Sequence, residues 1–532
     1  MSNVKLTSNP QHTFSYDEWP YESYPYSQSA PEHLATLAKL FGMNPADHKT
    51  SRILELGSSA GWNIIPHAMN NPKAEYVGVD LSKVEIDEAK KHVKELGLKN
   101  ITFHEMSISD IDESFGKFDY IICHGIISWV PEDVRKRIFE VTRDNLTTNG
   151  IAYISYNTKP GWNMVNNIRD MMLYHSKLFP NVQDKVAQGR LVLDFIVETL
   201  EGTKNPYAES LQNEAKIIKN QSDHYLRHDH LSDINNQFYF HDFMDQAAKC
   251  DLQYLADTSV ASMFIGNMPK RVVEKLQSIQ DIVRTEQYMD FINNRRFRST
   301  LLCHKSAQIN RNLDPNDIKK FNMNFNVQAE KPIADVDLKN SLESLQFYYQ
   351  QNKDNNISTS SPAMKAILYT FAESQEPVNF DDLVKNANKK LGGERSEEIT
   401  QELLNNAMRL VLQGYIELTI KDPIKYKKHK NPKISKIARY QAKNTNVQWI
   451  VNHHHKPIGI NLFEKCAIPY MDGTNTKDQI LEEIVKCVEN KIFTINQNGK
   501  AIDDPEEIKK QLTKLLDDLL NSIEIRAISS LD

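Results

Sequence analysis

The residues best suited to ligand chemistry lie in a turn marked by two glycines. The stretch ILELGSSAGWN (53–63) runs from an apolar strand into this turn, with Gly57 and Gly61 four positions apart. Glycine lets a backbone take positive φ and approach a ligand closely, and the following helix directs its N-terminus at that ligand. The pattern therefore predicts a cofactor loop between a strand and a helix.

Two cofactors fit such a loop. A dinucleotide site usually reads G-x-G-x-x-G, but here the third glycine is replaced by Trp62, which weakens that interpretation. S-adenosylmethionine has no phosphates, and Glu55 within the strand together with the two-glycine turn favours it. Asp80, at the end of EYVGVD (75–80), suits two vicinal ribose hydroxyls of either cofactor, because a carboxylate accepts both hydrogen bonds.

The elements around the loop alternate between strands and helices. This alternation predicts an α/β fold with a Rossmann-like, doubly wound parallel sheet. The expected strands are 52–56, 75–80, 100–105, 118–125 and 150–156, and the expected helices are 61–69, 83–97 and 131–146.

The rest of the chain divides by composition and pattern. We expect an aromatic leader or lid over 1–50 and a cofactor-binding domain over 51–162, which a helix and strand in 239–266 return to complete. The other expected parts are a helical insertion with a regulatory or dimerisation role (163–238), a connecting region (267–350) with a polar linker at 350–362, a winged-helix-like middle domain (351–424) and a winged-helix-like C-terminal domain (425–532).

Composition argues against several classes of partner. The 532 residues carry 64 Lys and Arg against 70 Asp and Glu, a net charge of −6, so nucleic acid is not expected as a partner. The uninterrupted apolar runs are shorter than the ~20 residues of a membrane span, so no membrane insertion is expected. The five cysteines form no C-x-x-C pair, and the first residues do not resemble an export signal. We therefore expect a cytoplasmic protein.

Three polar clusters have an alternative interpretation as binding sites. HHH (453–455) could bind a metal, but adjacent residues of an extended segment point to alternate faces, so we expect a loop. SDHYLRHDHL (222–231) lacks the spacing of a metal-binding helix, and we predict no metal site. The basic segment 425–443 could contact nucleic acid, but its prolines favour a solvated linker.

Several stretches together resemble one family. ILELGSSAGWNIIPHA (53–68), FDYIICHGIISWVPEDVR (118–135) and GIAYISYNTKPGWN (150–163) are similar to class I methyltransferases that carry a methyltransferase regulatory domain. The leader 16–42 and the segment 239–257 extend the likeness, which is greatest to the rickettsial protein-lysine methyltransferases that modify outer membrane protein B. The resemblance implies S-adenosylmethionine as cofactor, S-adenosylhomocysteine as product, and a protein substrate that is unfolded or extended before export. It also implies a homodimer.

The resemblance also implies roles for individual residues. It assigns the methionine tail to Glu55, Gly57 and Gly61, the ribose to Asp80 and Leu81, the adenine to Met106, Ser107 and Ile108, the methyl-transfer channel to His124 and Trp129, and a cover over the cofactor to Tyr16, Tyr21 and Tyr26. Ser59 and Asn63 belong to the same cofactor loop, Tyr16 is also a candidate for the substrate channel, and His124 is also a candidate cofactor contact.

The chemistry of amine methylation makes modest demands on side chains. Displacement at a sulfonium has a good leaving group, so positioning and desolvation of a neutral amine matter most. An aromatic, water-poor site lowers the pKa of lysine and attracts its alkylammonium stem. No dedicated general base is required, although His124 is the nearest candidate. The alternatives are a methyltransferase for RNA or a small molecule, and a ligand-sensing binding protein with winged-helix modules.

Overall fold

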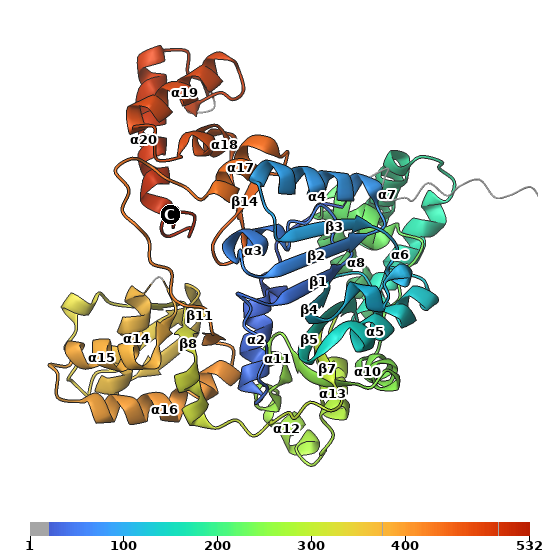
Figure 1. The fold of residues 1–532 in the computed structure, drawn as a ribbon, viewed down its shortest axis with the longest axis horizontal. Helices are drawn as coiled ribbons and strands as arrows, with labels where there is room; N and C mark the ends of the chain where they lie inside the picture. Colours follow the sequence, from blue (N-terminus) through green and yellow to red (C-terminus); the bar gives the residue numbers. More distant parts are fainter. Residues whose placement is uncertain (1–20, 375, 498–499, 532) are drawn as a thin grey trace, which may run out of the picture.

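A seven-stranded sheet forms the centre of the first half of the chain (Figure 1). The structure, a computed structural model, describes residues 21–374, 376–497 and 500–531. The strand order is β3-β2-β1-β4-β5-β7-β6; the first five strands are parallel, and β7 runs antiparallel to both its neighbours. The strands are β1 (Arg52–Leu56), β2 (Glu75–Asp80), β3 (Ile101–Glu105), β4 (Phe118–Cys123), β5 (Leu146–Asn157), β6 (Leu252–Asp257) and β7 (Phe297–His304). The predicted Rossmann-like α/β fold is confirmed.

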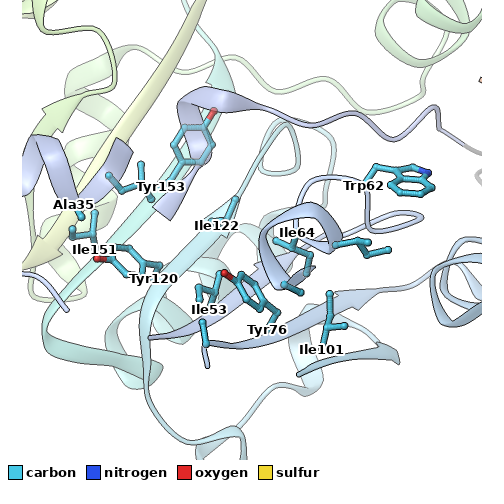
Figure 2. Packing of buried hydrophobic residues seen from close by; sticks show 14 of the residues in the cluster. Ala35, Ile53, Trp62, Ile64, Tyr76, Ile101, Tyr120, Ile122, Ile151 and Tyr153 are labelled. Carbon is cyan, nitrogen blue, oxygen red and sulfur yellow. The ribbon is translucent and has the colours of Figure 1, made fainter. Parts of the chain in front are cut away.

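Helices cover both faces of this sheet because strand side chains alternate between them. Ile53 packs in one face and Leu54 in the other. Figure 2 shows the first face, where Ile53, Tyr76 and Tyr120 pack near Ile64 at the start of α3. This face is covered by α2 (Pro31–Leu40), α3 (Ile65–Asn70) and α4 (Lys83–Leu96), and the opposite face by α5 (Glu132–Asn145) and α10 (Phe240–Lys249).

A helical insertion leaves the sheet after β5 and has its own small core, which includes Ile168, Leu193 and Leu211. It comprises α6 (Trp162–Ser176), α7 (Val182–Thr199), α8 (Pro206–Lys219), α9 (Asp223–Tyr225) and the π-helical turn η4 (Leu226–His230). The chain then returns through α10 to β6, at the edge of the sheet.

The expectation of a connecting region over 267–350 is wrong for its first part. After α11 (Val260–Met263), α12 (Lys270–Leu276) and α13 (Ile282–Asn293), the chain enters the sheet as β7, where Leu301 and Leu302 are fully buried. The partners of β7 are β5 and β6, which precede it by many residues, so its pairing cannot be inferred from local periodicity.

The middle domain extends from about residue 315 to 419 around one apolar core. The polar linker expected at 350–362 is instead a β-hairpin strand followed by a helix start, so the expected boundary at 351 falls inside the domain. The elements are η6 (Pro315–Lys320), β8 (Asn322–Asn324), β9 (Val327–Ala329), β10 (Leu345–Tyr349), β11 (Asn352–Thr359), α14 (Pro362–Glu373), β12 (Val378–Asn379), α15 (Phe380–Lys390), α16 (Ser396–Leu412) and β13 (Glu417–Thr419). Polar residues dominate β11 because it lies at the edge of its three-stranded sheet.

The C-terminal domain (residues 430–531) lies on the same side of the sheet domain as the middle domain (Figure 1). The expected linker over 425–443 is wrong for its second half, which begins α17 and buries Ile437 and Tyr440. The elements are α17 (Lys436–Asn444), β14 (Trp449–Val451), β15 (Pro457–Gly459), α18 (Leu462–Ala467), α19 (Lys477–Glu489), β16 (Asn496–Gln497), β17 (Lys500–Ala501) and α20 (Pro505–Ser522). Among the described residues, no helix has the length and apolar character needed to cross a membrane.

Candidate cofactor site

The glycine turn between β1 and α3 is held in the left-handed backbone region at three positions. Gly57 has φ 73°, Ser59 has φ 47° and Gly61 has φ 82°. A Cβ atom on Gly57 would lie 2.2 Å from Cδ1 of Ile126, and one on Gly61 would lie 2.4 Å from Cζ of Phe103. Both glycines are therefore required by conformation and by close contact, as expected for a loop that must bring its backbone against a ligand.

Glu55 points from β1 into a buried polar cluster behind this turn. Its side chain is 3% exposed, and its Oε1 accepts a hydrogen bond of 2.7 Å from Nδ2 of Asn63. Its Oε2 is buried and has no hydrogen-bond partner among the described residues. Burial raises the pKa of Glu55 to about 8, and the nearby charge of Asp80 adds to the increase. A cationic group of a ligand would stabilise the charged form of a buried carboxyl group whose pKa is raised, so Glu55 is suited to bind one.

This pKa predicts a pH-dependent cofactor affinity. Glu55 is largely protonated at pH 7, and an ammonium group placed beside it would favour the carboxylate. We expect binding of S-adenosylhomocysteine at pH 7 to release about one proton, and its Kd to fall by up to about tenfold per pH unit as the pH approaches 8. Calorimetry in buffers of different ionisation enthalpy measures this release. Glu55→Gln should abolish it, and a wild-type chain that releases no proton would contradict the prediction.

Asp80 and Ser59 tie the turn to the carboxyl end of β2. Oδ2 of Asp80 accepts a 2.9 Å hydrogen bond from the backbone N–H of Ser59, and Oδ1 accepts one of 2.9 Å from Ser82. The hydroxyl of Ser59 donates to Oε2 of Glu85 over 2.7 Å. The sequence placed Ser59 in the cofactor loop without a specific contact; in the structure it links the loop to two acids.

The residues predicted to flank ribose and adenine lie at the carboxyl ends of β2 and β3, which pair side by side. Leu81 is exposed, whereas Ile108 is buried. The backbone N–H of Met106 donates to the carbonyl of Asp80 over 2.9 Å, and Ser107 caps the short helix η2 (Ile108–Asp110). The predicted order of contacts along the sheet edge is thus compatible with one ligand that extends from β1 towards β3.

His124 follows β4 and contacts aromatic groups on two sides. Its Nδ1 lies 2.7 Å from the hydroxyl of Tyr153 and 3.2 Å from Oγ of Ser155. The ring of Tyr26 stacks on it with 3.7 Å between centroids. Burial lowers the pKa of His124 to about 3, so the ring is neutral and holds a proton poorly near neutral pH. His124 is therefore suited to shaping a low-polarity channel rather than to acting as a base.

Tyr21, predicted to cover the cofactor, and Trp129, predicted to border the channel, contact the helical insertion. Tyr21 lies edge-on to His228 at 5.1 Å, and Trp129 lies edge-on to Trp162, at the start of α6, at 6.4 Å. Tyr16 falls outside the described residues. The structure thus brings Tyr26 directly to the site and places Tyr21 and Trp129 where the site meets the insertion.

Trp62, in the position where a dinucleotide loop has glycine, is buried between two domains. Its ring lies 4.5 Å from that of His92 on α4 and 6.3 Å from each of Tyr440 and Trp449 in the C-terminal domain. In Figure 2 it stands apart from the labelled strand residues. Its backbone N–H donates to Oγ of Ser23 in the leader. The turn is therefore packed on its outer side by the leader and by the C-terminal domain.

Sequence reasoning missed two residues of the site. Glu85 lies three positions after Ser82, the N-cap of α4, and this S-x-x-E spacing was the available signal. Tyr153 lies in the apolar strand β5, and its role at His124 has no local signal because it depends on which strand pairs with β4.

These residues fit S-adenosylmethionine on three structural grounds. Oε2 of Glu55 is buried and has no hydrogen-bond partner within the described part of the chain, which suits the ammonium of a methionine tail. Side chains at Gly57 and Gly61 would collide with Ile126 and Phe103, so the backbone of the turn stays bare at both positions. Asp80 is fixed at the end of β2, where ribose hydroxyls are bound in Rossmann-like folds.

Family models match three parts of the chain. A methyltransferase domain matches residues 47–224, a predicted methyltransferase regulatory domain matches 222–304, and the C-terminal winged helix domain of PKMT matches 430–528. The last match agrees with the winged-helix-like fold expected at the C-terminus.

Relatives are similar over nearly the whole length. An uncharacterised protein of Rickettsia prowazekii is 57% identical over 507 residues, which cover 94% of this chain and 91% of the relative. The solved structure of PKMT2 from Rickettsia typhi in complex with AdoHcy is 41% identical, with a TM-score of 0.87 over 96% of this chain and 100% of that chain. The chain therefore belongs to the PKMT family and is an S-adenosylmethionine-dependent methyltransferase.

Proposed function

We propose that this methyltransferase modifies the side-chain amines of lysines in a protein substrate, an outer membrane protein that is still extended before export. The observation that carries the proposal is that the proposed channel is lined by neutral aromatic rings. His124 lies between Tyr26 and Tyr153. When bound, the cofactor supplies a methyl group on a sulfonium. The residues of the channel would exclude water and favour the neutral amine that attacks it.

A cleft beside the site supports a polypeptide substrate. It has a volume of about 460 Å³ and lies where the leader, the middle domain and the C-terminal domain meet. Ser27, one residue after Tyr26, contributes to its wall. Its lining includes two lysines, Lys421 and Lys456, and four acids, Glu32, Glu376, Glu417 and Asp422. An open cleft with excess negative charge suits an extended chain that carries lysines.

The acceptor assay tests this proposal directly. The chain is incubated with methyl-labelled S-adenosylmethionine and an unfolded outer membrane protein, and hydrolysates are analysed for methyllysine. A sample of the same substrate with acetylated lysines is the matched control. We expect methyllysine only in the unblocked substrate; label that appears only on RNA or on a small molecule would contradict the lysine assignment.

The helical insertion supports a proposed homodimer. Large apolar side chains on or beside α6, α7 and α8 are exposed, with Tyr174 at 82%, Leu178 at 80% and Phe195 at 65%. Leu191 and Phe195 are four positions apart on α7, so they share one face. Such a patch fits a two-fold contact with a second copy.

Light scattering after gel filtration measures the predicted dimer. We expect a mass of two chains for the wild type and of one chain for Phe195→Glu, because a buried charge at the interface is costly. Leu342→Glu, at an exposed position of the middle domain, should leave the dimer intact. A wild-type mass of one chain at micromolar concentration would refute this part of the proposal.

We also propose a cytoplasmic location. A substrate that is modified before export requires an enzyme on the same side of the membrane. The five cysteines are free thiols, and Cys123, Cys250 and Cys303 are buried, which is consistent with a reducing compartment.

A further inference from the structure

The three consecutive histidines 453–455 contact three different parts of the molecule. They lie in the turn between β14 and β15 of the C-terminal domain. Nε2 of His453 lies 2.6 Å from the carbonyl oxygen of Ser529 in the same domain, and Nε2 of His454 lies 3.4 Å from Oε1 of Glu376 in the middle domain. His455 instead enters the sheet domain. We call residues 452–456 the wing turn.

His455 reaches the cofactor loop across 392 positions of sequence. Its side chain is 4% exposed, its Nε2 lies 3.1 Å from Oδ1 of Asn63, and its ring lies 3.9 Å from the ring of His67. Burial lowers the pKa of His455 well below its usual range, so the ring is neutral.

The hydrogen bonds of Asn63 assign the donor in this contact. The backbone N–H of Tyr26 can only donate, and it donates to Oδ1 of Asn63 over 2.8 Å. Nδ2 of Asn63 donates to Oε1 of Glu55 over 2.7 Å and to Oγ of Ser29 over 3.0 Å. Oδ1 is therefore the acceptor, and His455 must carry its proton on Nε2 to donate to it.

Asn63 consequently joins three elements with both ends of its amide. Its oxygen holds the leader at Tyr26 and the wing turn at His455, and its nitrogen holds the carboxyl group of Glu55. Loss of the donor at His455 would remove one of the hydrogen bonds that fix the amide, and the orientation of Glu55 would be held less firmly.

We infer that one residue of the wing turn, His455, is part of the cofactor site, as a positioning residue that acts through Asn63 on Glu55. Its target is the amino-acid tail of the cofactor rather than the adenosine. This inference rests on the proposed placement of the methionine tail at Glu55. It gives the C-terminal domain a direct part in cofactor binding, which Trp62 supports by packing against Trp449 of the same domain.

Binding of two ligands to the full chain distinguishes a loss of tail recognition from a general loss of stability. S-adenosylhomocysteine carries the amino-acid tail, and 5′-methylthioadenosine lacks it. The loss variant is His455→Gly, because glycine tolerates the φ of 56° at this position without strain. His455→Gln is the rescue variant, since its amide nitrogen reaches about as far as Nε2 of histidine and can donate to Asn63. His454→Ala is the matched control in the same turn.

We expect His455→Gly to raise the Kd of S-adenosylhomocysteine about tenfold, in line with the loss of one buried hydrogen bond. The Kd of 5′-methylthioadenosine should stay within about twofold, His455→Gln should restore most of the affinity, and His454→Ala should leave it unchanged. An unchanged Kd for S-adenosylhomocysteine in His455→Gly would overturn the inference, and so would an equal loss for both ligands. If Glu55→Gln also binds like the wild type, the placement of the methionine tail has failed instead.

Discussion

Replacement of Asp80 by alanine should weaken the binding of S-adenosylhomocysteine about 100-fold. The change removes the carboxylate that we propose accepts from two ribose hydroxyls, and also the 2.9 Å hydrogen bond that holds the backbone N–H of Ser59. Hydrogen bonds to a charged group contribute about 1.5–3 kcal/mol each, and about 2.8 kcal/mol corresponds to a 100-fold change in Kd. Isothermal titration of the variant and the wild type measures the difference.

The matched control for this prediction is Asp87→Ala. Asp87 lies on α4 within a few residues of Asp80, but it is exposed and pairs with Lys83 at 2.7 Å. An exposed ion pair of this kind contributes little, so the control should bind the ligand like the wild type. An unchanged Kd in Asp80→Ala would remove Asp80 from the site, and equal losses in both variants would indicate a nonspecific effect on the domain.

Replacement of Trp62 by alanine should lower the free energy of unfolding of the sheet domain by about 3–5 kcal/mol, the usual cost of truncating a buried tryptophan. The ring is 2% exposed and packs between His92 and the C-terminal pair Tyr440 and Trp449. Because a multidomain chain need not unfold in one step, the measurement is the exchange of the slowest amide protons in β1 and β4.

Two further variants test whether the loss of stability comes from the buried ring of Trp62. Trp62→Phe should keep part of the lost stability because it retains an aromatic ring in the same space. Leu342→Ala, at a residue that is 94% exposed, should change stability by less than about 0.5 kcal/mol. Protection in Trp62→Ala equal to that of the wild type would show that the contact between the turn and the C-terminal domain contributes no stability.

Local patterns predicted most of the sheet and the part of the site that is contiguous with it. The strands around Ile53, Val77 and Ile121 have short apolar runs followed by helix signals, so their type and order could be predicted. The sequence pattern predicted Asp80 at the end of its strand, and the family resemblance implied Met106; the pairing of β2 with β3 places both at one edge of the sheet.

The failures share a physical cause. β7 was missed because its pairing partners precede it by many residues. The edge strand β11 has the polar composition of a linker, and its strand conformation comes from pairing with β10. The basic segment before Tyr440 resembled a linker because α17 buries only one face against other elements. In each case the decisive interaction partner is distant along the chain, and local composition does not report it.

By itself, the sequence determined the α/β class, the glycine turn and the acid at the end of β2, because each depends on backbone geometry within a few residues. Only the tertiary structure decided what the turn packs against. Asn63 and His455 are 392 positions apart, and their contact depends on the docking of a whole domain. The contact of Trp62 with Tyr440 depends on the same docking. Such docking depends on the summed burial of many side chains from separate elements, which local spacing does not encode.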